Sequence, residues 1–422
     1  MHADRYDNQI STQSGQAAEA YRRGVDCFLA ADIGAEEAFL AAIAADREFA
    51  LAYAALARSR QTMADIQGAR QAMAEAKAST AAMTEREQSH IHCLDLLIKG
   101  KSAEAYQAIL KHLECYPRDV MIAQPCTGVF GLIGFSGRPG RESEHLAFTY
   151  RIAQHYGEDW WFLTQLGFAQ MECGQVAVAE DTMARALEGN PRNANAAHYL
   201  AHLYYEMGAS KQAMHYLDDW MPDYSREALL HCHISWHQAL CALAVGDETG
   251  MWQIIDECVA PAGAWGPPIN VLTDVVAFLK RAELAGYEVA QARWQQISDY
   301  ALNKFPRPGV AFVDVHAALA HAMADNRDAL NDIINANKSP ASDVVQALAR
   351  AFQALAEQSW SRADEQLTVA MVDHARIGGS RAQRDLIEFL LADVLKRQGK
   401  TADAKRLLAM RRPVSARANG LL

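Results

Sequence analysis

The sequence predicts an all-α protein in which pairs of antiparallel helices stack into a superhelix. Half of the 422 residues are apolar, and alanine, the strongest helix former, is prominent among them. Alternating runs of Val, Ile and Thr, which are typical of half-buried strands, are almost absent. Small residues and turn residues also recur at a regular spacing of about 34 residues, which indicates a helical repeat.

The clearest repeat unit runs from Trp161 to Pro191. Its small and apolar positions match those of a tetratricopeptide repeat of about 34 residues, in which small side chains let the two helices of a hairpin approach closely. Gly174 permits the turn between the helices, and Pro191 follows the second helix, which it could not continue. One period later, Gly208 and Ala213 occupy the corresponding positions. We therefore expect a tetratricopeptide-like solenoid of helical hairpins.

Looser units occur in the rest of the chain. They are centred on turn residues Gly100, Gly246, Asn326 and Gly399. The N-terminal part, at about residues 17–83, also alternates helical segments, although its repeat pattern is weaker.

Two stretches rich in glycine or proline, Gly128 to Ser143 and Val259 to Val271, are predicted as loops between stacked pairs. We divide the predicted continuous solenoid into three parts. These are N-terminal helical pairs over residues 1–85, central repeats with a histidine-rich segment over 86–258, and C-terminal repeats with a GGSRAQRD motif over 259–422.

Composition restricts the partners of the chain. The net charge of −11 would repel a phosphate backbone, and the basic residues are dispersed, so we expect no nucleic-acid partner. No run of about eighteen apolar residues is present, so we expect no membrane span. The N-terminal segment lacks the apolar core of a signal peptide, and the eight cysteines form no Cys-x-x-Cys pair. These features predict a cytoplasmic protein with reduced thiols, and they are compatible with a homodimer.

Residues 193–246 contain six of the fifteen histidines. His198, His202 and Glu206 are spaced i, i+4, i+8, which places all three along one face of a helix. Counted from the turn glycine of their repeat, these positions face the inner, concave wall of the solenoid, which is the usual binding surface of such proteins.

Other units add residues to the same wall. His233 and His237 repeat the i, i+4 spacing in the next hairpin. The same counting places His233 and Trp236 in the groove, and it places His90 and His316 at the corresponding position of their own units. We therefore expect several imidazoles to converge on one wall.

Ordered motifs extend over essentially the whole chain. They are DRYDNQISTQSGQAAEAYRRGVD, FALAYAALA, TEREQSHI, PRNANAAHYLAHLYYEMG, HISWHQALCALAVGD, FVDVHAALAHAMAD and GGSRAQRDLIEFLLADVLKRQGK. In these motifs the chain resembles the tetratricopeptide repeat protein 38 family, which has a repeat fold and no defined biochemical activity. The chain departs from that family at Arg381, where a histidine is more usual, and at Asn193 and Asn195, which replace a more usual acid and aromatic residue.

The resemblance implies a set of motif positions without assigning them a role, and we take them as candidates for ligand binding. They are His198, His202, Glu206, His233, Trp236, His237, His316, Gln383, Arg384 and Asp385. So many titratable groups favour a small molecule or a short peptide, bound between the units at Ala194–Gly208 and Cys232–Gly246. A scaffold for protein partners, which is a second alternative, would instead present an extended open groove.

A metal ion is one interpretation of the histidine pair. Two imidazoles at i, i+4 can present nitrogens to one ion at about 2.0–2.1 Å, and His233 could complete the set. The pattern is not the H-E-x-x-H motif of metalloproteases. Glu206 lies about 12 Å along the helix from His198, so one ion cannot easily reach His198, His202 and Glu206 together. The sequence therefore does not decide whether the protein has a cofactor. If a metal ion is present, its expected ligands are His198, His202 and His233.

An enzyme is the alternative function. His202 and Glu206 could form a dyad that transfers a proton near neutral pH. Arg384 and Asp385 could hold a charged group of a ligand if the superhelix curls enough to bring them near. The third interpretation is a polar network in which the histidines bond to neighbouring carboxylates and fix the curvature of the array.

The remaining histidines are predicted to lie outside the site. We expect His112, His145, His155 and His374 on the surface, and His215 and His231 on outer or loop faces.

Overall fold

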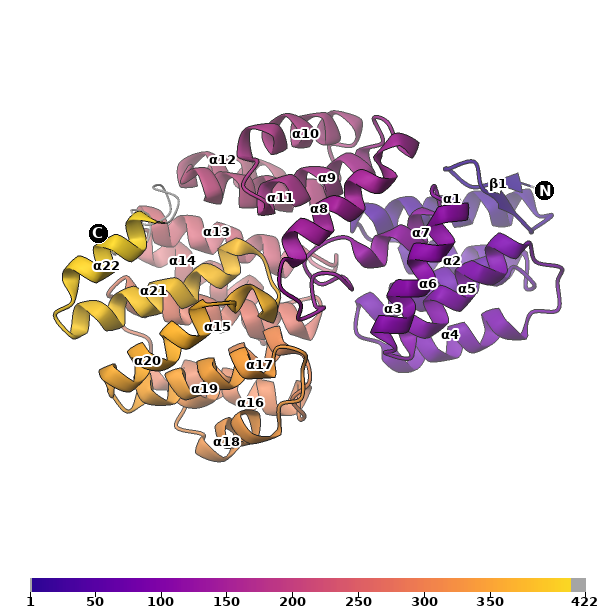
Figure 1. Ribbon diagram of the computed structural model, residues 1–422. Coiled ribbons are helices and arrows are strands. Elements are labelled where there is room, and N and C mark those ends of the chain that lie inside the picture. The colour runs from indigo at the N-terminus through magenta and orange to yellow at the C-terminus, as the bar shows by residue number, and fades with distance from the viewer. Residues whose placement is uncertain (1, 411–422) are drawn as a thin grey trace.

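The computed structural model describes residues 2–410, which fold into twenty-two α-helices and one short antiparallel strand pair. Consecutive helices form antiparallel hairpins that stack side by side into a curved superhelix (Figure 1). The predicted all-α class is therefore confirmed. The strand pair, β1 (His2–Ala3) with β2 (Gln9–Ile10), is an addition that the sequence patterns did not indicate.

We name three consecutive parts of the superhelix (Figure 1). The N-terminal lobe contains α1 (Gly15–Ala30), α2 (Ala35–Ala45), α3 (Ala50–Thr62), α4 (Ile66–Ala78), α5 (Glu85–Ile98), α6 (Ser102–Cys115) and α7 (Val120–Ala123). The middle segment contains α8 (Arg141–Ile152), α9 (Trp160–Glu172), α10 (Val176–Gly189), α11 (Ala194–Met207) and α12 (Ser210–Trp220). The C-terminal lobe contains α13 (His231–Val245), α14 (Glu248–Ile254), α15 (Pro268–Leu284), α16 (Gln291–Lys304), α17 (Ala311–Met323), α18 (Arg327–Ala336), α19 (Ser342–Ala356), α20 (Trp360–Met371), α21 (Arg381–Arg397) and α22 (Thr401–Ala409).

Short helical turns extend or join several of these helices. The 3₁₀ turns are Gln124–Cys126, Ala153–His155, Met221–Asp223 and His374–Ile377, and a π turn covers Ile255–Val259. Within the described range, none of the helices combines the length and the apolarity needed to cross a membrane.

The turn residues act as the repeat pattern predicted. The glycines at the predicted turns adopt the left-handed conformation, in which a residue without Cβ is unstrained. They are Gly100, Gly174, Gly208, Gly246 and Gly399, with φ between 65° and 81°. In the remaining unit Asp325 takes the left-handed conformation, and Asn326 caps α18 by accepting a hydrogen bond from the backbone N–H of Ala329.

The two predicted loops are shorter than expected. Helix α8 already begins at Arg141, and α15 begins at Pro268. Proline is favoured in the first turn of a helix because that turn leaves its N–H groups unpaired, so the proline-rich stretch starts α15 instead of excluding it.

The apolar faces of the helices form two large cores. One extends from Tyr6 to Phe162 through the N-terminal lobe and into α9, and the other lies within the C-terminal lobe from Cys232 to Val394. Smaller, separate apolar clusters lie between them in the middle segment. Each part of the superhelix therefore has its own apolar core, as expected when each repeat packs mainly against its neighbours.

The superhelix curls back on itself at helix α21. This helix contacts α15 and α11. Arg281 of α15 donates a hydrogen bond to the carbonyl oxygen of Ala382 at 2.5 Å, and the Tyr205 hydroxyl donates to Asp385 Oδ2 at 3.1 Å. Residues almost two hundred positions apart in the sequence are therefore in contact.

A loop also links the two lobes. We call residues 127–140, which include most of the glycine-rich stretch, the closing loop. Arg376 of the C-terminal lobe donates to the Gly137 carbonyl oxygen at 2.9 Å and to that of Pro340 at 2.7 Å. Just after the loop, Arg141 donates to the carbonyl oxygens of Ala375 and Gly379, each at 2.6 Å. The closing loop is therefore held against the C-terminal lobe.

The GGS part of the GGSRAQRD motif lies where the C-terminal lobe packs against the closing loop. Gly378 and Gly379 both have positive φ, 97° and 76°. A Cβ at Gly379 would lie 2.3 Å from a ring carbon of Phe312, and a Cβ at Gly378 would lie 2.7 Å from one of Phe135. Ser380 then caps α21. The two glycines let the backbone pass close to aromatic rings of the closing loop and of α17.

We predict that Gly379→Ala destabilises the fold more than the matched substitution Gly399→Ala. Both glycines have φ of 76°, but a Cβ at Gly399 would meet no atom within 4 Å. The control should cost about 1–2 kcal/mol of backbone strain. Gly379→Ala should add roughly 1–3 kcal/mol for the clash with Phe312. Urea denaturation of both variants measures the difference, and equal losses would contradict the tight packing at Gly379.

Candidate functional site

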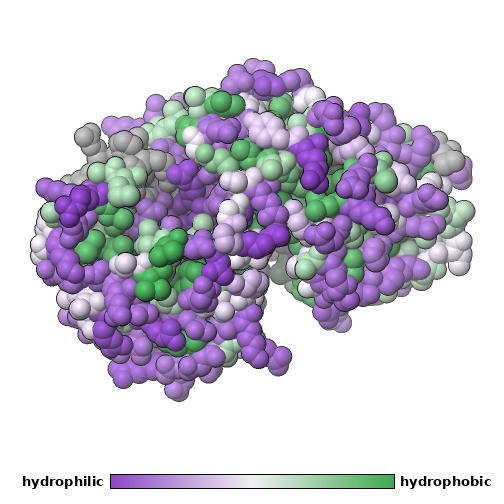
Figure 2. All heavy atoms as spheres, in the orientation of Figure 1, coloured by the Kyte–Doolittle hydropathy of each residue, from purple (hydrophilic) through white to green (hydrophobic). Residues whose placement is uncertain are grey.

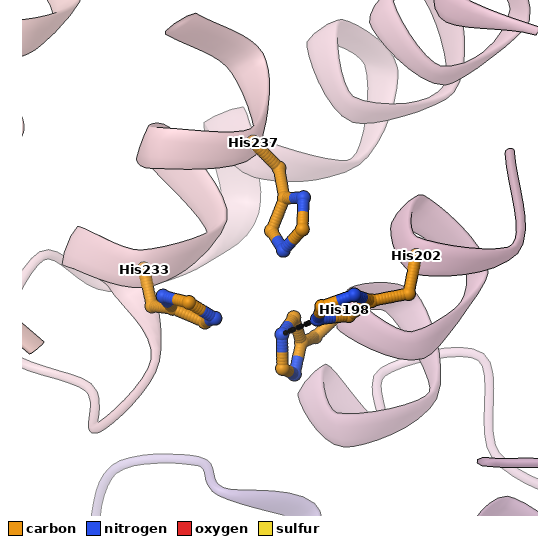
Figure 3. Close-up of side chains that lie close together, drawn as sticks. All are labelled: His198, His202, His233 and His237. Carbon is orange, nitrogen blue, oxygen red and sulfur yellow. Dashed lines mark hydrogen bonds between the residues drawn. The ribbon is translucent and has the colours of Figure 1, made fainter. Parts of the chain in front are cut away.

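Four histidines from two helices meet inside the middle of the superhelix (Figure 3). His198 and His202 lie on α11, and His233 and His237 lie on α13. All four are buried, and one nitrogen of each ring lies within 4.8 Å of those of the other three. We call this group the histidine cluster. The expected convergence of imidazoles on one wall therefore holds for these four residues.

The local sequence explains how the two helices present these rings. The i, i+4 spacing stacks each pair on one face. Asn193 caps the start of α11, because its side chain accepts hydrogen bonds from the backbone N–H groups of Asn195 and Ala196. Small residues of α11, including Ala197 and Ala201, share an apolar cluster with Ile234 of α13. The small side chains let the two helices approach until the imidazoles face one another.

Hydrogen bonds fix part of the cluster. His233 Nδ1 lies 2.7 Å from Asp274 Oδ2 of α15, so the Nδ1–H donates to the carboxylate. The other nitrogen of that ring then points toward the remaining histidines (Figure 3). Nε2 of His202 lies 2.8 Å from Nε2 of His198. Among the described residues, no hydrogen-bond partner is found for His237 Nε2.

Burial keeps three rings of the cluster uncharged. The pKa values of His198, His202 and His237 are held well below the usual range for histidine, mainly because burial penalises the charged imidazolium and secondarily because the other imidazoles are close. Burial also raises the pKa of Asp274, and the contact with His233 partly offsets this rise. Three of the four imidazoles are therefore neutral at physiological pH, and each has one nitrogen lone pair, one of which the hydrogen bond between His198 and His202 uses.

Aromatic side chains surround the cluster. Trp236 is fully buried and stacks on His233, with ring centroids 5.3 Å apart and planes 12° from parallel. Phe168 contacts His202 edge to face at 6.1 Å. Trp161 lines the neighbouring cavity.

A cavity of about 840 Å³ adjoins the cluster. Its walls come from α1, α3, α6, α9, α11, α13 and α15, from the closing loop, and from residues 309–311 and 339–341 of the C-terminal lobe. The surface is indented between the two lobes (Figure 2). His198 and His233 line the cavity, whereas His202 and His237 are not among its lining residues. The cavity therefore depends on the curling of the superhelix, because both lobes and the closing loop contribute to it.

Arg58 of α3 is the most unusual residue of the cavity wall. It is partly buried, and its guanidinium donates to Gln61 Oε1 at 2.8 Å and to Gln124 Oε1 at 2.8 Å. No described carboxylate forms an ion pair with it. Burial lowers the pKa of Arg58 only to about 10, so the group stays charged near neutral pH. Arg138, the other arginine of the wall, is already paired with Glu144.

The remaining predicted site residues occupy other places. Glu206 is buried on α11, one turn beyond His202. His316 of α17 is buried, and its Nδ1 donates to the carbonyl oxygen of Phe312 at 2.7 Å. Burial lowers the pKa of His316 to about 4.

Gln383, Arg384 and Asp385 lie in the first turn of α21 and take part in closure. The Gln383 side chain completes a capping box with Ser380, and Arg384 Nη2 lies 2.7 Å from Glu142 Oε1. Asp385 accepts the hydrogen bond of Tyr205 described above. The superhelix therefore does curl enough to bring the GGSRAQRD motif to α11, and the binding roles of these residues stay predictions.

Three histidines outside the cluster correct the sequence analysis. His112, His145 and His231 are buried, at 2%, 6% and 8% exposure, instead of lying on the surface or on outer faces. His112 bonds to Ser89 and Asp119, and His145 packs against Phe168. Ser89 and Phe168 lie on the adjoining helices α5 and α9, and Asp119 follows α6, so periodicity within one helix did not reveal these contacts. His215 is exposed, as expected.

Sequence reasoning missed two residues that matter here, Asp274 and Arg58. Asp274 stands alone in the apolar run NVLTDVVAFL, and Arg58 follows the apolar run FALAYAALA. A single charged residue at a buried helical position requires a partner or a ligand, so both were detectable signals.

No protein-family model matches the chain. Among solved structures it is similar to a tetratricopeptide repeat protein from Parabacteroides merdae, with 16% identity, 72% of this chain and 98% of that chain covered, and a TM-score of 0.35. It is also similar to a human IFIT1 dimer with PPP-AAAA, with 14% identity, 98% and 96% coverage and a TM-score of 0.44. Yeast Tom70 gives 12% identity, 93% and 82% coverage and a TM-score of 0.37. At identities this low, the ligands of these proteins say nothing about the ligand of this chain. The ligand has to be inferred from the side chains of this chain.

We predict that His145→Gln reduces the loss of stability in acid. Burial, assisted by Arg141, lowers the pKa of folded His145 to about 4, whereas an unfolded histidine titrates near about 6.5. The wild-type chain therefore loses stability as pH falls from the unfolded toward the folded value. Between about pH 7 and pH 5 the free energy of unfolding should fall by about 2 kcal/mol less in the variant. Urea denaturation at both pH values tests this, and identical losses would show that His145 is not buried as a neutral ring.

Proposed function

We propose that this chain binds a small organic anion in the cavity between its lobes. The single observation that carries the proposal is Arg58, a charged guanidinium in the cavity wall that, among residues 2–410, bonds only to the neutral amides of Gln61 and Gln124. Removing a charge from bulk water without a counter-charge is costly, so a cation left unpaired inside a cavity favours an anionic group of a ligand.

The size and lining of the cavity support a small molecule over a peptide. Its volume of about 840 Å³ falls within the range of about 300–1,000 Å³ typical of small-molecule sites. Aromatic and aliphatic side chains, including Phe28, Trp161 and Tyr199, supply apolar contacts, and Asn195 and Asn270 supply polar ones. An extended peptide would need a long groove, whereas this cavity is bounded by both lobes and the closing loop. The ligand class is therefore an anion with an apolar body.

The family assignment is part of the same proposal. The ordered motifs from DRYDNQISTQSG to GGSRAQRD support membership of the tetratricopeptide repeat protein 38 family. The solved structures are too distant in sequence to test membership of this family. The cytoplasmic location is also an expectation from the sequence.

An enzyme acting on the bound anion is the second candidate function. The observation that favours it is that His198 and His233 belong both to the histidine cluster and to the cavity wall. These two rings are therefore better placed than the His202–Glu206 pair to touch a ligand. A neutral imidazole at this wall could accept a proton from a bound molecule.

A pair of fluorescent probes tests the anion proposal. Anilinonaphthalene sulfonate carries a negative charge on an apolar body, and N-phenylnaphthylamine has a similar body without the charge. Arg58→Gln should weaken binding of the sulfonate about tenfold, equivalent to roughly 1.4 kcal/mol, because it removes the charge that faces the anionic group. Binding of the neutral probe should change little.

Arg60→Gln is the matched control on the same helix. Arg60 is paired with Glu36 and does not line the cavity, so this variant should bind both probes like the wild type. Equal affinity of Arg58→Gln and wild type for the sulfonate would reject the anion assignment. Failure of both probes to bind the wild type would reject the cavity as a ligand site.

A further inference from the structure

The histidine cluster has nitrogen lone pairs that the protein itself does not use. Nδ1 of His233 is committed to Asp274, which leaves its Nε2 as a lone-pair donor facing the cluster. His237 Nε2 is buried, and no partner for it is found among the described residues. A buried polar atom without a partner costs free energy, so an occupant that accepts these lone pairs would stabilise the group.

We propose that His198, His202, His233 and His237 together bind one divalent late transition-metal ion, with zinc as the best fit. All four rings offer one nitrogen to the same small space, within 4.8 Å of one another (Figure 3). The inference goes beyond the proposed anion binding and does not rest on it. It also extends the sequence-based ligand set, because His237 becomes the fourth ligand.

The spacing of the nitrogens fits a tetrahedral ion. Bonds of about 2.0–2.1 Å to zinc place tetrahedral nitrogens about 3.4 Å apart. In the structure the closest pair, His198 and His202, is 2.8 Å apart, and the whole set lies within 4.8 Å. The nitrogen–nitrogen spacing of about 3.4 Å around a zinc ion lies between the observed 2.8 Å and 4.8 Å. Small rotations of the side chains would therefore replace the hydrogen bond between His198 and His202 with two bonds to the ion.

Asp274 gives the second reason to infer a metal. Metal-bound histidines usually donate their other ring N–H to a carboxylate, which fixes the tautomer and raises the basicity of the ligating nitrogen. Asp274 is buried, and its Oδ2 lies 2.7 Å from His233 Nδ1. The stacked ring of Trp236 holds His233 from the side. His233 is thus oriented as a ligand before any ion arrives.

The chemistry of the set selects the metal. Four imidazole nitrogens without an oxygen or thiolate ligand suit zinc, copper, nickel or cobalt, and they do not suit calcium or magnesium. Cys232, the neighbour of His233 in the sequence, is directed instead to the carbonyl oxygen of Val259. Two of the ligands, His198 and His233, also line the cavity, so the ion would sit at the cavity wall and within reach of a bound molecule.

The test uses the full chain purified without a histidine tag. Elemental analysis after mild purification should find about one equivalent of zinc. After treatment with a chelator, addition of Co²⁺ alone should produce the visible absorption bands of tetrahedral cobalt, and Zn²⁺ should abolish them. Less than roughly a tenth of an equivalent of metal, together with no cobalt spectrum in the wild type, would overturn the proposal.

Variants then locate the site. Asp274→Asn should weaken zinc binding by about 10–100-fold, because the carboxylate that orients His233 is lost while all four ligands remain. His237→Ala should weaken it at least as much and remove the tetrahedral cobalt spectrum. The control His215→Ala changes an exposed histidine on α12 and should bind zinc like the wild type. Wild-type affinity in His237→Ala, with a circular dichroism spectrum showing intact helices, would overturn the proposed ligand set.

Two further readouts separate misfolding from metal loss. Zinc should raise the thermal midpoint of the wild type and of His215→Ala, and should raise that of a folded His237→Ala much less. If His237→Ala does not fold, the Asp274→Asn affinity decides the question. Binding of the two fluorescent probes reports the cavity separately, so loss of metal with normal probe binding would leave the proposed anion site intact.

Discussion

Buried ion pairs at the start of α21 hold this superhelix closed. Arg384 lies 2.7 Å from Glu142 of α8 and 3.7 Å from Glu172 at the end of α9, and the backbone N–H of Arg381 donates to Glu172 at 3.1 Å. Burial raises the pKa of Glu172, and Arg384 lowers it again, so each charge compensates for the other's loss of water. Removing one partner of such a pair typically costs about 3–5 kcal/mol, because the other charge is left buried and alone. This contact joins the last helical pair to the middle of the chain, beside the bonds of Arg141 and Arg376 that hold the closing loop at the cavity.

The closed superhelix also places α11 at the centre of the histidine cluster and the cavity. This helix contacts α9 on one side, α13 on another and α21 on a third. It supplies His198 and His202 to the histidine cluster, and Tyr199 to the cavity wall. Asp274 reaches the cluster from α15, which is also the helix that holds α21 through Arg281. The histidine cluster, the cavity and the contacts that close the superhelix therefore share helices α11 and α15. A substitution in one of these places should shift the side chains packed around the other two.

The sequence predicted the parts of this structure that depend on local periodicity. The helical class follows from composition, and the turn positions of Gly174, Gly208 and Gly246 follow from the repeat. The meeting of His198 with His233 follows from counting helical positions against those glycines. Burial of His112 and His145 did not follow, because it depends on how their helices pack against the adjoining helices, through Ser89 for His112 and Phe168 for His145. The role of Arg384 in closure could not be predicted either, since its partner Glu142 lies more than two hundred residues earlier. Arg58 and Asp274 could have been noticed as lone charges in apolar helices, but their partners are visible only in three dimensions.

Small-angle X-ray scattering of the full chain in solution tests the closed superhelix most directly. We expect the scattering curve calculated from the closed arrangement to fit the measured curve without any rearrangement of the lobes. It would be contradicted by a radius of gyration and a maximum dimension that require an extended, open solenoid, because Arg58 and the histidines would then lie on separate surfaces with no cavity between them.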